Sequence, residues 1–368
     1  MKYNMRKVLV FGMTENPGGI ESVIMNYYRY IDKNQIQFDF LCNCTKIAYE
    51  EEIEELGGVI YKITPRKKNY LRFKKELKEF MQLHAYEYYA IWVNVCSLVN
   101  IDYLIYAKKY NIPKRIIHCH NSANDGGKIK LLIHRYNKKR IFRYATDFWS
   151  CSEDAAPWFF DKTIVNSARY RVIPNAIDVR KYKRSQSIRE EYRKRLGLED
   201  KIVIGHVGRF HFQKNHRFLI EIFEELSKRK DEYHLLLVGQ GELEQEIKEL
   251  VKNRNLENKV TFLGARSDMC NIYQVMDCFV MPSQSEGLGI VALEAQATQV
   301  PCVLSDTIPV VTKVNDNVIF ISLQKAVKEW ADEIESIICQ SGSEIKNKMV
   351  GSQYDILTQI ENFERILF

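Results

Sequence analysis

The chain has 368 residues, of which 46% are apolar and 27% are charged, and its formal net charge at pH 7 is +7. This length and composition are typical of a globular protein with two domains, and they exclude a disordered or fibrous chain. The sequence contains no run of about 18 apolar residues, so it predicts no membrane-spanning helix.

The first half of the chain alternates predicted strands with predicted helices. Strands are predicted over 7–11, 38–42, 59–63, 90–93, 115–119, 147–151 and 170–173, and helices over 19–31, 50–56, 71–83, 102–110 and 131–143. The short apolar run at 8–11 ends in a glycine-containing turn. We therefore interpret it as a first buried strand instead of a signal peptide, and we expect a cytoplasmic protein.

The second half repeats this alternation after a charged segment, 180–200, which we interpret as a connector. Strands are predicted over 201–207, 234–238, 260–262, 278–281, 300–304 and 318–321, and helices over 216–228, 243–253, 269–275, 290–297 and 354–367. Two such series predict an α/β protein with two doubly wound, mostly parallel sheets. Ligands bind outside the carboxyl ends of strands in this architecture, so we expect the site in a cleft between the two domains.

The positive charge is concentrated in the first half of the chain. Residues 1–180 hold 29 Lys and Arg against 19 Asp and Glu, which gives +10; the rest hold 25 against 28, which gives −3. A basic first half favours a polyanionic partner, namely nucleic acid, an anionic membrane or a phosphate-rich substrate.

The nine cysteines form no Cys-x-x-Cys pair, which favours reduced thiols over disulfides or a metal site.

Two carboxylates flank a glycine-containing turn after the strand predicted at 278–281. Glu286 precedes Gly287, Leu288 and Gly289, and Glu294 lies six residues beyond Leu288, about 9 Å along a helix that opens near Leu288. Backbone N–H groups at a helix start can hold an anion, and the two carboxylates can accept hydrogen bonds from hydroxyl groups. The alternative is an acidic residue that stabilises the helix dipole together with one solvated glutamate.

Basic residues follow the strand predicted at 201–207. Gly208 and Arg209 come at its end, and Lys214 lies five residues after Arg209. An arginine fork and a lysine can bind phosphate oxygens and stabilise the charge of a diphosphate leaving group. Two exposed basic residues without a ligand are the alternative.

Two further groups lie in the first half. Gly18 and Gly19 follow the first strand and open the first helix, where a backbone can approach a phosphate, although this is not a GxGxxG motif. His118 and His120 end the strand predicted at 115–119 and share one of its faces. A metal site there lacks a third ligand, so we interpret His120 as a hydrogen-bonding residue and His118 as an interior histidine.

In this order and spacing, the groups resemble the retaining GT-B glycosyltransferases that use UDP-sugars and related donors. The resemblance rests on the Glu286–Glu294 pair, Gly208-Arg209 with Lys214, and Gly18-Gly19. It also rests on Pro174-Asn175 with Asp178, Val238-Gly239 with Gly241, and the segment 262–268, which contains Arg266. It covers essentially the whole chain and points to the bacterial branch that builds capsular or exopolysaccharide units. One departure is Ala176, where the family commonly has glycine.

The resemblance implies a domain at 1–178 that binds the acceptor, to which the helix at 350–368 crosses back, and a nucleotide-sugar domain at 179–349. It assigns catalytic positions to His120, Arg209, Lys214 and Glu286. Donor contacts fall to Gly18, Gly19, Asn175, Gly208, Gly241, Arg266, Gly287, Leu288, Gly289 and Glu294. It also implies retention of anomeric configuration, no metal and no cofactor. The expected donor is a nucleotide-diphosphate sugar, most commonly UDP-linked, that carries a hexose or N-acetylhexosamine.

The basic segments 66–78 and 128–143 mix Lys and Arg with apolar residues, as interfacial helices do. Our hypothesis is an enzyme bound to the cytoplasmic face of the membrane that acts on a polyprenyl-diphosphate-linked glycan. The alternative is a helix packed on the core with a solvated basic face. A catalytically inactive sugar-nucleotide binder and a GT-B epimerase are the other readings of the site. A nucleic-acid-binding protein is disfavoured because no recognition motif is present.

Overall fold

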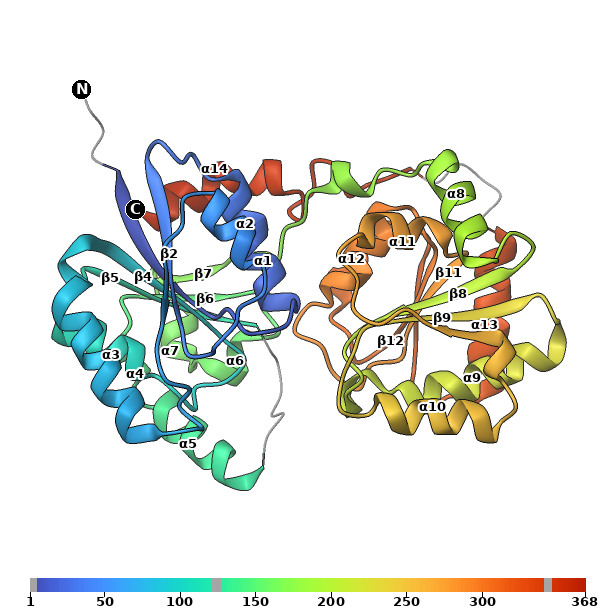
Figure 1. Cartoon of the computed structure of the whole chain (residues 1–368), viewed down its shortest axis with the longest axis horizontal. Coiled ribbons are helices and arrows are strands. Elements are labelled where there is room, and N and C mark those ends of the chain that lie inside the picture. Colours follow the sequence, from blue (N-terminus) through green and yellow to red (C-terminus); the bar gives the residue numbers. More distant parts are fainter. Residues whose placement is uncertain (1–4, 121–126, 341–345) are drawn as a thin grey trace. The chain divides into compact units, whose positions relative to one another are not determined.

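The computed structural model describes residues 5–120, 127–340 and 346–368, and these fall into two compact units (Figure 1). Unit 1 comprises Met1–Ala176 together with Ile356–Phe368, and unit 2 comprises Ile177–Asp355.

Unit 1 is built on a seven-stranded parallel sheet in the order β3-β2-β1-β4-β5-β6-β7. Its strands are β1 (Arg6–Phe11), β2 (Ile36–Cys42), β3 (Ile60–Lys62), β4 (Tyr88–Val95), β5 (Lys114–Cys119), β6 (Asp147–Ser150) and β7 (Tyr170–Val172). The strand order runs outward in opposite directions from β1 and β4. The topological switch point, where ligands bind in sheets of this kind, therefore lies between β1 and β4.

Helices cover both faces of this sheet. They are α1 (Gly19–Tyr30), α2 (Glu50–Glu55), α3 (Tyr70–His84), α4 (Asp102–Lys109), α5 (Lys128–Lys138), α6 (Ala156–Phe159), α7 (Lys162–Val165) and α14 (Ile356–Leu367). Leu9, Ile91 and Ile117 pack with α3 and α4 on one face. The neighbouring strand residues point to the other face because side chains alternate along a strand. The sequence did not predict the one-turn helices α6 and α7.

The last helix, α14, belongs to the core of unit 1. Phe363 is buried and its ring lies 4.2 Å from that of Tyr27 in α1, and it also packs against Trp92 and Trp149 of the sheet. The backbone N–H of Asp32 donates to the Glu364 carboxylate. The expected return of the final helix to the first sheet is therefore confirmed (Figure 1).

Unit 2 contains a six-stranded parallel sheet in the order β10-β9-β8-β11-β12-β13. Its strands are β8 (Ile202–Val207), β9 (Tyr233–Val238), β10 (Val260–Phe262), β11 (Cys278–Met281), β12 (Cys302–Ser305) and β13 (Val318–Ile321). Its switch point lies between β8 and β11. Both sheets confirm the predicted fold class of two doubly wound α/β units.

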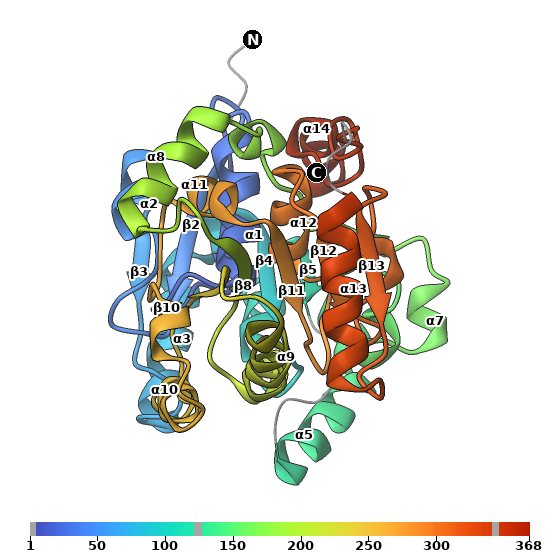
Figure 2. The same cartoon turned by 90° about the vertical axis from the view of Figure 1, so that its right-hand side faces the viewer.

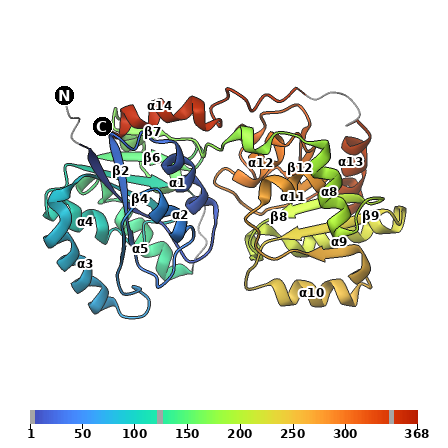
Figure 3. The same ribbon diagram turned by 45° about the horizontal axis from the view of Figure 1, so that its top comes forward.

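Figure 3 shows helices on both sides of the second sheet. One layer is α9 (His216–Arg229), α10 (Glu244–Asn253) and α13 (Val327–Gln340); the other is α8 (Gln186–Leu196), α11 (Met269–Val275) and α12 (Ile290–Ala297). The interpretation of 180–200 as a connector was wrong. Ser185 caps α8 by accepting a hydrogen bond from the Ile188 N–H, and α8 packs against α11.

Helix α13 was also not predicted, although Trp330, Ala331, Ile334 and Ile337 recur at helical spacing and are buried. Helix α12 spans Ile290–Ala297 as predicted, and Gly289 at its N-cap adopts a left-handed conformation with φ of 76°. Short 3-10 turns span Val179–Tyr182 and Phe212–Lys214.

Candidate functional site

The two motifs of the second half meet at the switch point of unit 2. Gly208 and Arg209 follow β8, and the segment 282–289 follows the neighbouring strand β11. Because parallel strands end at the same edge, the topology brings these loops together although the sequence separates them by more than 70 residues.

A salt bridge joins the two loops. Lys214 Nζ lies 2.7 Å from Glu286 Oε1, and both side chains are mostly buried. Two further hydrogen bonds hold the same pair of loops, since the Gln284 N–H donates to the Gln213 carbonyl at 2.7 Å and the Gln213 side chain donates to the Ser285 carbonyl at 2.6 Å. The position of the Lys214 ammonium is therefore fixed by several interactions.

Glycines make the adjoining loops close-packed. A Cβ on Gly239, whose φ is +135°, would lie 2.1 Å from the Gly208 carbonyl oxygen, and one on Gly241 would lie 2.4 Å from the Phe210 carbonyl oxygen. The Gly208 N–H donates to Val238 O, and the Phe210 N–H donates to Gln240 O. The loop after β9 thus supports the loop that carries Arg209.

The two arginines assigned to this site differ in their surroundings. The Arg209 side chain is exposed, and no hydrogen bond or ion pair to another described residue is found for it. Arg266 is exposed as well, but its guanidinium makes a two-point contact with Asp268 at 2.8 and 2.6 Å. Arg209 is thus available to an anionic ligand, whereas Arg266 has an internal carboxylate partner.

The turn before α12 is buried at Gly287, Leu288 and Gly289. The Thr312 hydroxyl donates to the Leu288 carbonyl at 2.6 Å, which fixes the turn. The N-terminus of α12 supplies a partial positive charge beside the Lys214–Glu286 pair.

Glu294 lies on the buried side of α12 and accepts a 2.9 Å hydrogen bond from the hydroxyl of Tyr273 in α11. Tyr182 hydrogen-bonds to the same carboxyl. Burial raises the pKa of Glu294 to about 7, and these tyrosine hydroxyls oppose the rise. Sequence reasoning missed both tyrosines because neither belongs to a motif.

The switch point of unit 1 gathers Gly12, Asn94 and His120 from the ends of β1, β4 and β5. A Cβ on Gly12 would lie 2.7 Å from the Cβ of Asn94. His120 Nε2 and Asn94 Oδ1 are 2.9 Å apart. Burial lowers the pKa of His120 to about 3, so the imidazole is neutral at physiological pH. Sequence analysis did not single out Asn94.

Asn175 is the third polar residue of this group and is buried. Tyr27 and Asn26 of α1 donate to the carbonyls of Pro174 and Ala176, which positions the residue between them. Its side chain hydrogen-bonds to the His120 imidazole, and this contact opposes the lowering of the His120 pKa by burial. His120 therefore contacts both Asn94 and Asn175, and the three side chains form one polar group at this sheet edge.

Gly18 and Gly19 are exposed at the start of α1, as a backbone that receives a ligand must be. The buried carboxylate of Glu21 folds back over this start and accepts hydrogen bonds from the Thr14 hydroxyl at 2.5 Å and the Thr14 N–H at 3.1 Å. Burial raises the pKa of Glu21. Glu21 thus shapes the loop that carries the two glycines.

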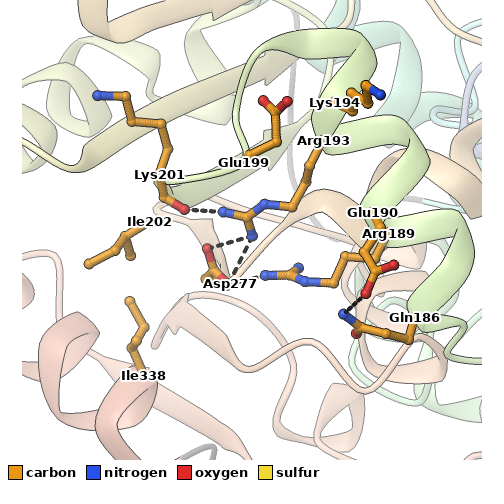
Figure 4. A pocket seen from close by; sticks show the side chains of 10 residues that line it. All are labelled: Gln186, Arg189, Glu190, Arg193, Lys194, Glu199, Lys201, Ile202, Asp277 and Ile338. Carbon is orange, nitrogen blue, oxygen red and sulfur yellow. Dashed lines mark hydrogen bonds and ion pairs between the residues drawn. The ribbon is translucent and has the colours of Figure 1, made fainter.

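A cavity of about 520 Å³ lies elsewhere, at the start of β8 (Figure 4). Arg189 and Arg193 line it, but both bind Asp277, and Arg189 also donates to carbonyls at the end of α11. These arginines have structural partners, so the cavity does not resemble a prepared anion site. Within the described ranges, no three His, Cys, Asp or Glu side chains are grouped as metal ligands.

Two family models match the chain. Residues 188–352 match the model for glycosyl transferases group 1, and residues 17–181 match the model for glycosyltransferase family 4. The matched ranges contain every residue to which the resemblance assigns a catalytic position or a donor contact.

Curated relatives extend over most of the chain. A protein of Bacillus subtilis (strain 168) described as glycosyltransferase EpsF is 32% identical over 345 residues, which are 91% of this chain and 88% of the relative. The UDP-Gal:alpha-D-GlcNAc-diphosphoundecaprenol alpha-1,3-galactosyltransferase of Escherichia coli is 26% identical over 298 residues, which are 78% of this chain and 76% of the relative.

Among solved structures, Anabaena Alr3699/HepE in complex with UDP and glucose superposes with a TM-score of 0.82 at 20% identity, covering 98% of this chain and 99% of that one. At this identity the likeness establishes the shared fold.

Proposed function

Because the chain belongs to the group 1 glycosyl transferases, we propose that it transfers a hexosyl or N-acetylhexosaminyl group from a UDP-sugar to a glycan acceptor, with retention of anomeric configuration. The observation that carries this proposal is the Lys214–Glu286 pair at the switch point of unit 2, beside the exposed Arg209. The UDP found with the Anabaena protein supports the choice of nucleotide.

Departure of the nucleotide leaves a negative charge on its diphosphate. Arg209 and Lys214 supply two cations for this charge, and the start of α12 adds a partial positive charge. In this proposal no metal is needed for leaving-group stabilisation. Lys214 is already held by Glu286, so its ammonium needs little reorganisation when the charge develops.

The two glutamates have separate roles. Glu286 accepts hydrogen bonds from hydroxyl groups of the transferred sugar, and Glu294 accepts them from the ribose. The tyrosines that hold Glu294 keep its carboxyl in one orientation for that contact. Gly287, Leu288 and Gly289 contribute backbone N–H groups, and Gly208 and Gly241 contact the donor through their backbones.

Unit 1 contributes hydrogen-bonding groups to the same reaction. His120 is neutral, so it contacts the transferred sugar as a hydrogen-bonding group and does not deliver a proton from an imidazolium. Asn175, Gly18 and Gly19 complete this set. The leaving phosphate itself takes the proton of the acceptor hydroxyl as that oxygen attacks the same face of the sugar, so no protein base is assigned.

The proposed acceptor is a polyprenyl-diphosphate-linked glycan used in capsular or exopolysaccharide synthesis. The Escherichia coli relative, whose name specifies a diphosphoundecaprenol-linked acceptor, supports this choice.

The test is a panel of UDP- and GDP-sugars incubated with the purified chain in the presence of EDTA, with thermal shift and nucleotide release as readouts. We expect one UDP-sugar to raise the melting temperature and to be consumed when a diphosphate-linked acceptor is added. The linkage formed should have the same anomeric configuration as the sugar in the donor. Binding without consumption by any acceptor would favour an inactive binder, epimerised donor would favour an epimerase, and no binding would overturn the assignment of the site.

A further inference from the structure

Helix α5 exposes an apolar stripe. Ile129, Leu132, Ile133 and Tyr136 are 75%, 64%, 36% and 63% exposed. Their spacing of i, i+3, i+4 and i+7 places them on one side of the helix. A surface helix ordinarily packs such a stripe against the core. In α5 the stripe faces solvent instead. The sequence left open a helix that packs its apolar side on the core, and the exposure of these four residues contradicts that alternative.

The opposite side of α5 is anchored by polar contacts. His134 and Asn137 are buried. His134 accepts from the Leu98 N–H at 3.1 Å and contacts the Trp158 carbonyl at 3.0 Å, and Asn137 donates to the Leu98 carbonyl at 2.6 Å. These hydrogen bonds hold the helix in place without using the apolar stripe.

Cations surround the stripe. The segment 128–143 contains seven Lys and Arg and no Asp or Glu. Its exposed basic residues are Lys128, Lys130, Arg135, Lys139 and Arg143. Phe142, which follows the helix, is 49% exposed.

A second basic and apolar edge lies at the start of α3. Tyr70 and Leu71 are 48% and 80% exposed, and Lys67, Lys68 and Arg72 are exposed next to them. Both α3 and α5 lie toward the lower end of unit 1 in Figures 1 and 2.

We propose that α5 docks unit 1 on a bilayer containing anionic lipid. Its apolar stripe inserts at the boundary of headgroups and acyl chains, and its Lys and Arg side chains bind headgroup phosphates. Within the described residues, no helix is long and apolar enough to traverse a bilayer, so this contact is one that lies on the surface.

The charge pattern selects this occupant over a second copy of the chain. A symmetric dimer through α5 would set the same cations of two molecules against each other. An anionic surface instead neutralises them while the stripe leaves water. The proposal is independent of the donor and acceptor chemistry above, and it is tested without either.

The experiment is sedimentation of the full chain with vesicles of phosphatidylcholine alone or with 30% phosphatidylglycerol, at roughly 50 and 500 mM salt. We expect binding to the anionic vesicles at low salt. We expect at least about tenfold weaker binding for Leu132→Ser/Tyr136→Ser and for Lys128→Gln/Lys130→Gln/Arg135→Gln. The matched controls are Val310→Ser, at an exposed apolar residue of unit 2, and Lys230→Gln/Lys252→Gln, at two exposed lysines there.

All of these positions are exposed, so thermal melts should show unchanged folding. Wild-type binding that both α5 variants retain would overturn the proposal, as would no binding to any vesicle. Light scattering without vesicles tests whether the stripe instead forms a dimer. A dimer that Leu132→Ser/Tyr136→Ser dissociates would assign the stripe to a second copy of the chain.

Discussion

Lys214 and Glu286, which are 72 positions apart in the chain, form a 2.7 Å salt bridge at the point where β8 and β11 end side by side. The pair is mostly buried, so removal of either partner leaves a charge without its counterion in a poorly solvated place. The pair therefore has two roles: it holds the two loops together, and it sets the charge of the proposed donor site.

Lys214→Ala should weaken donor binding by roughly 10- to 100-fold, because one charge-assisted contact to the diphosphate is lost. Titration calorimetry with the best UDP-sugar measures the effect. Arg217→Ala, at an exposed arginine three residues further on whose partner is Glu246, is the control and should bind normally. Equal affinity of the Lys214→Ala protein and the wild type would contradict the proposed phosphate contact.

Glu294→Gln should alter how stability depends on pH. The pKa of Glu294 is about 7 in the folded chain against an ordinary 4.5, so folding takes up a proton between these values. This group therefore makes stability fall as pH rises from 4.5 to 7, by up to about 3 kcal/mol, and adds no further pH dependence above that window.

Urea unfolding at several pH values between 4.5 and 8 measures this dependence. The wild type should lose stability relative to Glu294→Gln as pH rises through the window, whereas the exposed Glu249→Gln should follow the wild type. Parallel curves for the wild type and Glu294→Gln would show that the carboxyl titrates normally.

Gly239→Ala should destabilise unit 2 by roughly 3 kcal/mol, because the φ of +135° is strained for alanine and its Cβ would strike the Gly208 carbonyl oxygen. Thermal unfolding gives the change. Gly127→Ala is the control, since a Cβ there meets no atom within 4 Å. A normal melting temperature for Gly239→Ala would mean that the two loops can separate at little cost.

Phe363→Ala should destabilise unit 1 by about 3–5 kcal/mol, since the ring is buried between Tyr27, Trp92 and Trp149. Near-ultraviolet circular dichroism of the tryptophans follows the loss during urea unfolding. Leu357→Ala, at a half-exposed residue of the same helix, should cost much less. Similar losses for both variants would mean that α14 contributes by its backbone alone.

The sequence was sufficient to place the strands of both sheets along the chain, because each parallel strand is a short apolar run bounded by turns. It was also sufficient for the place of Lys214 and Glu286, since both follow strands and such residues lie at one sheet edge. Helix α8 escaped prediction because its sequence, Gln186–Leu196, is highly charged and buries Arg193 by pairing it with Asp277. That partner is visible only once β11 is placed.

The surroundings of Glu294 and the orientation of α5 could not be predicted from the sequence, for a related reason. Tyr182 and Tyr273 reach Glu294 from two other elements, and no spacing rule relates them. In α5 the apolar periodicity is plain, but periodicity identifies a stripe without saying whether core or solvent receives it. The hydrogen bonds of His134 and Asn137 decide that question.

The position of α14 has a consequence for how the protein is made. Unit 1 begins the chain, yet its aromatic core stays open until residues 356–368 have been synthesised, after the whole of unit 2. At ordinary elongation rates of about 5–20 residues per second, roughly 14 seconds or more pass between the synthesis of Trp92 and that of Phe363, which lies 271 residues later. During that interval the nascent first unit presents an unfilled apolar site, and unit 2, whose sheet is contiguous in the chain, is the part that can complete its core first.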